Sequence, residues 1–206
     1  MLDILLATRN AGKIREICRA AAELPIAWHT PDEFPQVPEV EENGQTFAEN
    51  ARLKALYYAR ATGLHALADD SGLEVDVLRG APGVHSARYA GTPRDDAANN
   101  RKLVAALAGI PIEQRTARFR CAMAFADPQR VLLETEGTFE GLIIDQPRGT
   151  NGFGYDPHFL VPELGLTAAE LGLEEKNARS HRGQALRAML SGLRLFLHAG
   201  SDPQRG

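Results

Sequence analysis

The stretch 66–73 limits the possible folds of this chain more than any other. An apolar run stops abruptly at two adjacent carboxylates, Asp69 and Asp70, and residues 73–77 then alternate apolar and polar. This pattern predicts a strand, a tight turn and a second extended segment. Neighbouring side chains of an extended chain point to opposite faces, so Asp69 and Asp70 are predicted to diverge. The same residues also fit a turn with both acids in water.

Length and charge restrict the class of protein. A chain of 206 residues can bury a sizeable core, and we expect one domain over residues 1–206. The formal charge of −4 argues against a non-specific binder of nucleic-acid polymers. Cys18 and Cys121 lie far apart without metal-site spacing, which fits a reducing compartment. No stretch is typical of a signal peptide or a membrane span, so we expect a cytoplasmic protein with no membrane partner.

The first residues predict a strand, a loop and a helix. Residues 2–7 predict a buried strand, residues 8–13 form a polar turn, and a helical period begins at Ile14. Lys13 therefore stands at a helix start, where free backbone N–H groups and the helix dipole attract anions. The segment is not a standard P-loop, because the upstream Gly and the Ser or Thr after the lysine are missing. The alternative is a turn whose lysine is merely solvated.

Further elements follow from periodicity, capping and turn signals. They are a strand at 26–29, a helix from the Thr46 capping box to Thr62, a helix opened by Thr92, a hairpin of strands 116–126 and 131–138, a second capping box at 167–170, and a last helix after Ser180. Residues 149–157 hold three glycines, two aromatics and an acid, which suggests close approach of the backbone to a ligand. They also fit an irregular loop whose aromatics fill the core.

Six ordered blocks of this chain resemble the inosine triphosphate pyrophosphatase family. The blocks are Thr8, Asn10, Gly12 and Lys13; 42–51 with Lys54; 68–73; 80–89; 152–157; and 180–185. The resemblance implies an α/β fold with a long central mixed β-sheet flanked by helices, and two lobes with a cleft between them. It implies a homodimer that hydrolyses ITP, dITP and XTP to the monophosphate and pyrophosphate, with Mg²⁺ as cofactor.

The resemblance also implies roles for individual residues. Glu42 and Asp70 match the metal ligands, Asp70 matches the proton acceptor for the attacking water, and Lys13 and Lys54 match phosphate-binding positions. The matched substrate-binding residues are Thr8, Asn10, Gly12, Lys13, Ser71, Phe153, Gly154, Tyr155, Asp156, Lys176, His181 and Arg182. These residue types suit the chemistry, because attack on a phosphate needs charge neutralisation, Mg²⁺ prefers oxygen ligands, and a purine needs an aromatic face and hydrogen-bond donors.

One residue departs from the family pattern. Arg9 stands where the family usually has a small residue, so its side chain crowds the phosphate loop, points outward or adds a phosphate contact. Two other functions remain open at this point. One is the related septum-formation-inhibitor type of nucleotide pyrophosphatase, and the other is a nucleotide-binding regulator that has lost catalysis. The residues Ser180, His181 and Arg182 favour the first family, and Asp70, Glu42 and Lys13 argue against the regulator.

Overall fold

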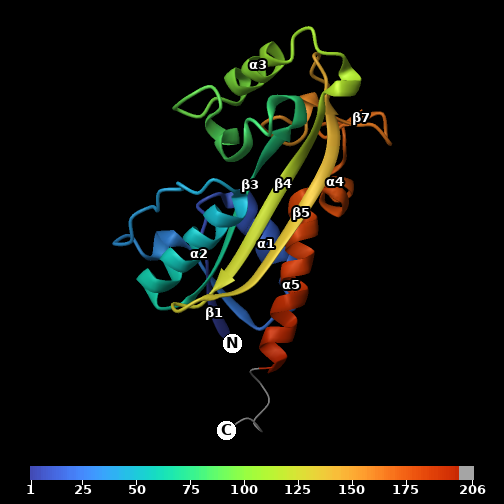
Figure 1. The fold of residues 1–206 in the computed structure, drawn as a ribbon. Helices are drawn as coiled ribbons and strands as arrows, with labels where there is room; N and C mark the ends of the chain where they lie inside the picture. Colours follow the sequence, from blue (N-terminus) through green and yellow to red (C-terminus); the bar gives the residue numbers. More distant parts are fainter. Residues whose placement is uncertain (200–206) are drawn as a thin grey trace. The chain divides into compact units, whose positions relative to one another are not determined.

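A computed structural model of the protein describes residues 1–199. Its strands form one seven-stranded mixed sheet in the order β2-β1-β3-β4-β5-β6-β7 (Figure 1). They are β1 (Leu2–Leu6), β2 (Ile26–His29), β3 (His65–Val75), β4 (Thr116–Ala126), β5 (Val131–Ile143), β6 (Phe159–Val161) and β7 (Leu166–Thr167). β1 pairs in parallel with β2 and β3, whereas β6 pairs antiparallel with β5 and β7. The predicted α/β class with a mixed sheet is confirmed.

Helices connect these strands. They are α1 (Ala11–Ala20), α2 (Phe47–Thr62), α3 (Asp96–Ala106), α4 (Leu173–Arg179) and α5 (His181–Ala199). Short 3₁₀ turns are η1 (Pro31–Glu33), η2 (Asp76–Leu78), η3 (Gly83–Arg88), η4 (Ile112–Gln114) and η5 (Asp156–His158). Among residues 1–199 no helix combines the length and the apolar character that crossing a membrane requires.

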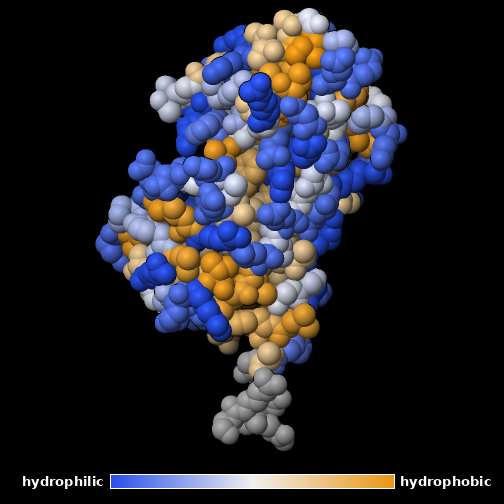
Figure 2. Space-filling view, viewed as in Figure 1, coloured by the Kyte–Doolittle hydropathy of each residue, from blue (hydrophilic) through white to orange (hydrophobic). Residues whose placement is uncertain are grey.

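The chain divides into two compact units. Among residues 1–199, the first unit comprises Met1–Asp70, Ala122–Glu136 and 185–199, and the second comprises Ser71–Cys121 and Gly137–Gln184. β3, β4, β5 and α5 each contribute residues to both units. In Figure 2, hydrophilic residues cover most of the visible face, and hydrophobic residues gather where Figure 1 draws the arrowhead of β4.

Helix α2 shows how sequence signals set an element of the first unit. The Thr46 hydroxyl accepts from the Glu49 N–H (3.1 Å), and the Glu49 carboxylate accepts from the Thr46 N–H (3.3 Å). Gly63 ends the helix in the left-handed conformation with φ of 75°, which glycine adopts without steric cost. The predicted bounds are confirmed. One consequence matters for function: the buried face of α2 includes the polar residues Asn50 and Lys54.

The second unit has its own apolar core. The buried members of this core are Leu73, Val75, Leu103, Leu107, Ala117, Phe119, Phe139, Ile143, Tyr155, Phe159, Val161, Ala168 and Leu171. Two polar contacts tie loops to it, because the Tyr155 hydroxyl donates to the Ser86 carbonyl (2.7 Å) and the Ser86 hydroxyl accepts from the Leu73 N–H (2.8 Å). The loops around residues 86 and 155 are thereby held against β3.

The predicted turn after Asp70 was wrong. β3 continues from His65 to Val75 through both acids, Ser71 and Gly72 without interruption. The strand lies inside the sheet, between β1 and β4, so ladder pairing outweighs the local turn preference of Asp-Ser-Gly. The divergence of the two acids does not depend on a turn, because alternation continues along a strand.

Two helix starts and one capping signal also differ from prediction. α1 begins at Ala11 rather than Ile14, because the Asn10 side chain caps it. α3 begins after Asp95, whose side chain accepts from the Ala98 N–H, so Thr92 is not the cap. The predicted capping box at 167–170 closes only a turn. The Thr167 hydroxyl donates to the Arg148 carbonyl instead of capping a helix, although Glu170 does accept from the Thr167 N–H (2.7 Å).

Candidate active site

The loop before α1 is built by short polar contacts. The Asn10 carbonyl oxygen accepts from the N–H groups of Gly12 (2.9 Å) and Lys13 (3.2 Å), and the Thr8 hydroxyl accepts from the Asn10 N–H (3.2 Å). A Cβ added at Gly12 would lie 3.1 Å from Asn10 Oδ1, so glycine suits this close approach. Two of the N–H groups expected to attract an anion are thus already bonded to Asn10. The loop therefore contributes mainly by placing the Lys13 side chain.

Lys13 contacts the first of the two adjacent acids. Its Nζ lies 2.6 Å from Asp69 Oδ2, and Asp69 is buried with 5% of its surface exposed. The contact joins the first turn of α1 to β3 within the first unit. Asp69 thus fixes where the ammonium of Lys13 lies, a role that sequence reasoning did not assign to it.

Asn50 connects the acidic loop to Asp70. Its Nδ2 donates to Asp70 Oδ2 (3.0 Å), and its Oδ1 accepts from the Gly44 N–H (2.8 Å). Asn50 is 1% exposed, and a Cβ added at Gly44 would lie 2.7 Å from its Oδ1. The predicted site omitted Asn50. The available signal was a polar pair, Asn50 and Lys54, one turn apart on a helix face that otherwise packs inward.

Lys54 is a buried ammonium among carboxylates. Its Nζ lies 3.0 Å from Glu42 Oε1 and 3.9 Å from Asp70 Oδ1, and only 8% of the residue is exposed. Burial acts to lower the pKa of Lys54, but the carboxylates of Asp69, Asp70 and Glu42 outweigh it and raise that pKa above its usual value. Lys54 therefore stays charged at neutral pH.

For Asp70, burial outweighs the neighbouring opposite charge. Burial raises the pKa of Asp70 above its usual value, and the nearby carboxylates Glu42 and Asp69 add to the rise. The Lys54 ammonium and the hydrogen bond from Asn50 oppose it. A carboxylate whose pKa is raised is a better proton acceptor than an ordinary aspartate. Glu42, Asp69, Asp70, Lys13 and Lys54 thus form a compact group, which we call the lysine–carboxylate cluster.

The cluster fits a divalent cation in its donor types. Glu42 and Asp70 both approach the same ammonium, and their mutual repulsion contributes to the raised pKa of Asp70. Such oxygen donors suit Mg²⁺, which commonly takes one or two carboxylates and completes its shell with water and substrate phosphates. Across residues 1–199 the structure contains no ready-made group of three or more His, Cys, Asp or Glu side chains that could hold a metal.

A second set of predicted residues lies in the loop before η5. The Asp156 carboxylate accepts from the Phe153 N–H (2.8 Å) and pairs closely with the Lys176 ammonium from α4. A Cβ added at Gly152 would lie 2.1 Å from Asp156 Oδ2 and 2.7 Å from Lys176 Nζ, and Gly152 has φ of 77°. Glycine is therefore required here both for backbone conformation and for space.

The two aromatics of this loop have different environments. Tyr155 is buried in the core of the second unit, and burial raises the pKa of its hydroxyl far above the usual range. Phe153 is 53% exposed. Three cations surround its ring, with Lys176 Nζ at 5.7 Å, Arg182 Cζ at 5.8 Å and Arg94 Cζ at 5.9 Å from the centroid. Phe153 offers an aromatic face, whereas Tyr155 anchors the loop.

The start of α5 supplies the remaining predicted residues. The Ser180 hydroxyl accepts from the Gly183 N–H (3.1 Å) and so caps the helix. Arg182 Nη2 donates to the Ser71 hydroxyl (3.1 Å). His181 is buried rather than on the surface, and its ring stacks on Phe119 with centroids 5.1 Å apart and planes 17° apart. Ser71, Phe153, Asp156, Lys176 and Arg182 are thus linked by contacts within the second unit.

Arg9, which precedes the Asn10 cap of α1, pairs with an acid of η1. Its guanidinium forms an ion pair with Asp32 in η1, and the two side chains are 45% and 71% exposed. Of the three outcomes expected for this position, this ion pair between exposed side chains favours an outward side chain. Arg9 therefore does not crowd the loop.

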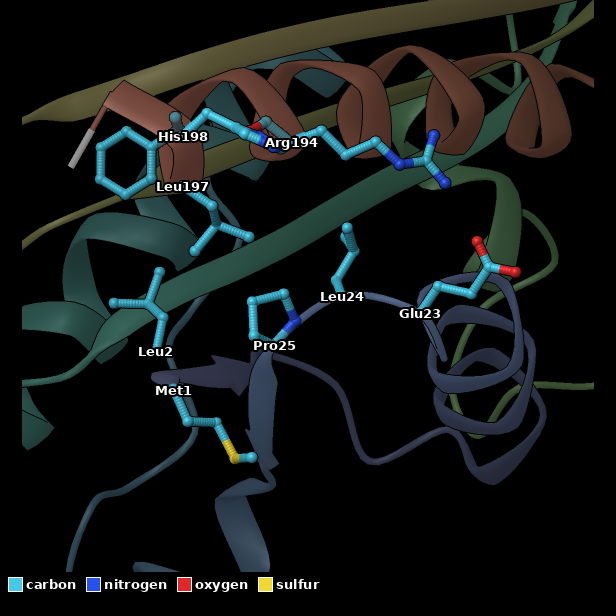
Figure 3. A pocket seen from close by; sticks show the side chains of 9 residues that line it. Met1, Leu2, Glu23, Leu24, Pro25, Arg194, Leu197 and His198 are labelled. Atoms are coloured by element: carbon cyan, nitrogen blue, oxygen red, sulfur yellow. The ribbon is translucent and has the colours of Figure 1, made fainter. Parts of the chain in front are cut away.

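A separate pocket of about 720 Å³ lies in the first unit. In Figure 3 the side chains of Leu2, Pro25 and Leu197 face a common space, with Met1 and His198 nearby. None of the predicted site residues lines it. Because its lining is mainly apolar and offers few convergent polar groups, it is a poor place for a triphosphate.

Comparison with known proteins decides the family. The model of the Ham1 family matches residues 4–192. The chain belongs to the Ham1 family. A Ham1 relative from Desulforamulus reducens named dITP/XTP pyrophosphatase is 52% identical over 198 residues, covering 96% of this chain and 98% of the relative. Another of that name from Geobacter sulfurreducens is 54% identical over 186 residues, with coverage of 90% and 94%.

Solved structures give the same result for the fold. A HAM1 protein from Coxiella burnetii matches with a TM-score of 0.89 and 46% identity, covering 94% of this chain and 99% of that one. A nucleoside-triphosphatase / dITP/XTP pyrophosphatase from Mycobacterium abscessus matches with a TM-score of 0.81 and 46% identity, with coverage of 92% and 99%. The resemblance carried by the six sequence blocks is confirmed, and the Ham1 fold accounts for almost the whole chain.

Proposed function

We propose that this protein hydrolyses non-canonical purine nucleoside triphosphates, namely ITP, dITP and XTP, to the monophosphate and pyrophosphate. The lysine–carboxylate cluster carries the proposal. It combines two ammonium groups, which suit a polyanion, with a carboxylate whose pKa is raised. The names of the relatives, dITP/XTP pyrophosphatase, support the choice of substrate.

The reaction follows from the roles of these side chains. Water attacks the α-phosphorus while Asp70 accepts its proton, and the bond between that phosphorus and the bridging oxygen to the β-phosphorus breaks. Pyrophosphate leaves with the bonding electrons, and the nucleoside monophosphate remains. Lys13 and Lys54 neutralise the charge that develops on the phosphate oxygens. Such electrostatic stabilisation is usually the largest contribution to catalysis of this kind. Asn50 orients Asp70 through the bond from its Nδ2 (3.0 Å).

Glu42 and Asp70 are the residues that would hold Mg²⁺. When bound, the ion supplies positive charge to the phosphate oxygens and to the attacking water. Asp70 would then serve both as a ligand and as the proton acceptor. Asp69 is paired with Lys13 (2.6 Å), so Glu42 and Asp70 are the carboxylates that would hold the ion.

We assign base recognition to the second unit. Phe153 provides a stacking face, and Lys176, His181 and Arg182 provide donors for the purine edge. Inosine and xanthine carry an oxygen at C6, which accepts from these donors, whereas adenine presents an amino group that would meet a second donor. The site therefore prefers oxo-purines over adenine. GTP shares the C6 oxygen, so its rejection needs a further feature near C2.

The other two sequence-based functions are less well supported. Curated relatives at about half identity carry the name dITP/XTP pyrophosphatase, which disfavours the septum-formation-inhibitor type. An inactive regulator is disfavoured because the lysine–carboxylate cluster holds an intact set of charged groups. A homodimer, a single two-lobed domain and a cytoplasmic location stay predictions from the sequence and the family resemblance.

A nucleotide panel tests the proposal. Purified protein with Mg²⁺ is incubated with ITP, dITP, XTP, GTP and ATP, and pyrophosphate and orthophosphate are measured separately. We expect pyrophosphate and a monophosphate from the first three. Orthophosphate and a diphosphate as the primary products would contradict the reaction, and equal rates with ATP would contradict the substrate class. The same panel without added Mg²⁺ and with EDTA tests the metal.

A further inference from the structure

Helix α3 holds the loop that carries Phe153. The Gly154 N–H donates to Asp96 Oδ2 (3.0 Å), and the Gly154 carbonyl accepts from Asn100 Nδ2 (2.8 Å). Both polar groups of one peptide residue are thus bound by a single helix. Asp96 and Asn100 are four residues apart, which places them on the same face of α3. None of these α3 residues was among the predicted site residues.

The orientation of the Asn100 amide shows that this contact is specific. Its Nδ2 reaches the Gly154 carbonyl, while its Oδ1 is buried and has no hydrogen-bond partner in the part of the chain that the structure describes. An unpaired buried oxygen costs free energy. The bond to Gly154 is therefore the contact that the Asn100 side chain is placed to make.

Arg94 connects Asp96 to the aromatic ring of Phe153. Its Nε donates to Asp96 Oδ1 (2.8 Å) and its Nη2 to Asp96 Oδ2 (3.2 Å). Its guanidinium carbon lies 5.9 Å from the centroid of the Phe153 ring. Asp96 therefore binds the backbone next to Phe153 and, through Arg94, a cation at the ring itself. Both links lie within the second unit.

An exposed phenylalanine normally samples several orientations, which weakens any ligand that must stack on it. Phe153 is 53% exposed, but its own N–H is fixed by Asp156 (2.8 Å) and the next residue is bound on both sides by α3. A ring fixed before the ligand arrives loses less entropy on binding. An open aromatic face on a fixed backbone is suited to stacking a flat heterocycle.

We propose that Asp96 and Asn100 are positioning residues that hold Phe153 ready to stack on the purine of the substrate. This inference rests on the proposed function, because it names Phe153 as the stacking face. It assigns α3 a part in substrate affinity through Phe153, with no direct contact between α3 and the reacting phosphates. Loss of either contact raises KM for purine nucleotides and leaves kcat unchanged.

Kinetics on three variants test the proposal. Asp96→Ala removes the acceptor for the Gly154 N–H, and Asn100→Asp replaces the donor to the Gly154 carbonyl with a repelling oxygen at almost constant shape. Asp95→Asn is the matched control, because it removes one charge from the adjacent residue while asparagine still caps α3. We expect KM for ITP to rise by up to about tenfold in the first two variants, the factor that the loss of one hydrogen bond typically gives, with kcat unchanged. The control should match wild type.

Hydrogen exchange provides a readout that does not depend on activity. We expect the amides of residues 152–155 to exchange faster in Asp96→Ala and Asn100→Asp than in wild type or Asp95→Asn. If Asp96→Ala does not fold, Asp96→Asn, which keeps an oxygen acceptor for Gly154, should give an intermediate KM and intermediate exchange. Unchanged KM and unchanged exchange would overturn the positioning role.

The two proposals fail in different ways. If wild-type protein releases no pyrophosphate from any purine triphosphate, the proposed function is wrong, and the exchange experiment still decides whether α3 holds the loop. If wild type is active and the variants lose kcat with KM unchanged, α3 acts on the chemical step and the positioning role is wrong.

Discussion

The two units hold their polar residues in different ways. In the first unit the working side chains are enclosed: Asn50, Asp69 and Lys54 are 1%, 5% and 8% exposed, and each charge faces an opposite charge. In the second unit the corresponding element is an exposed ring, Phe153, on an irregular loop that α3, α4 and α5 support with charged and amide side chains.

This difference follows from what each unit is proposed to bind. Neutralising a triphosphate and accepting a proton require charges that are already oriented and poorly solvated, because such charges act more strongly and need no reorganisation. Stacking on a base requires an open apolar face. The comparison predicts that changes in the first unit alter the reaction of every nucleotide alike, whereas changes in the second unit alter the choice among them.

The largest effect is expected for Asp70→Asn. The variant keeps the shape but loses the proton acceptor and a metal ligand, so kcat should fall by about 10²–10⁴-fold for ITP, dITP and XTP alike. Steady-state rates of pyrophosphate release measure this, with the exposed Asp145→Asn as control. If kcat fell by different factors for the three nucleotides, the proposed division of roles between the two units would be wrong. If the variant kept wild-type kcat, Asp70 would not take part in the reaction.

Replacement of Lys54 by Met should come next. The nearly isosteric side chain removes the ammonium that faces Glu42 and Asp70. A charge-assisted contact contributes about 1.5–3 kcal/mol, so kcat/KM should fall by about one to two decades with every nucleotide. Lys102→Met is the control, because Lys102 is exposed and donates to the Tyr89 carbonyl. A melting curve verifies folding, and an unchanged kcat/KM would make Lys54 a structural residue only.

Arg182→Ala should act on selectivity. It removes a donor assigned to the C6 oxygen, so kcat/KM for ITP should fall by about tenfold or more, while the low rate with ATP changes little. The ratio of ITP to ATP rates therefore narrows, and the ratio of ITP to GTP changes less. If the ITP to ATP ratio keeps its wild-type value, Arg182 does not recognise the base.

Gly152→Ala should have a smaller effect in the same unit. The new Cβ would lie 2.1 Å from Asp156 Oδ2, so Asp156 has to move away from Lys176 and from the Phe153 N–H. We expect KM for ITP to rise several-fold. Gly154→Ala is the matched comparison, because its φ is also positive (63°) but a Cβ there meets nothing within 4 Å. A larger effect at position 154 would mean that backbone strain, not crowding of Asp156, matters.

The smallest effect is expected for His29→Gln, which should change the thermal stability of the protein near neutral pH. The carboxylates of Asp3 and Glu33, each 2.8 Å from a ring nitrogen of His29, raise the pKa of that histidine. A raised folded-state pKa stabilises the protein below the unfolded value of about 6.5, and this contribution disappears as pH rises through the folded value. The melting temperature of wild type should exceed that of His29→Gln at pH 6, and the gap should close at pH 9. A gap independent of pH would contradict the ion-pair explanation.

The fold was largely predictable because its signals are local. The Thr46 capping box, Gly63 and the alternation of residues 116–126 each set an element without help from the rest of the chain. The failures occurred where distant residues compete with a local preference. Asp70, Ser71 and Gly72 favour a turn, but they belong to a strand that continues through them inside the sheet, so they stay extended.

The candidate site was predictable in its residues but not in its contacts. The sequence motifs identify Lys13 and Asp70 as candidate site residues. The pairing of Lys13 with Asp69, in contrast, joins α1 to a strand more than fifty residues away in the sequence, and no local motif predicts it. The contribution of α3 was missed for the same reason, since Asp96 and Asn100 read as ordinary polar residues of an exposed helix. Their proposed role in holding the Phe153 loop becomes visible only from their hydrogen bonds to Gly154 in the structure.

The hydrogen bonds from Gly44 through Asn50 to Asp70 have a consequence for sequence variation. Any side chain at position 44 collides with Asn50 Oδ1, and any residue at position 50 without both an acceptor and a donor releases either the loop or the acid. The effects of substitutions at these three positions therefore depend on one another and do not add. Because a change at any one of them disturbs the contacts of the others, the three residues are expected to persist or disappear as a group.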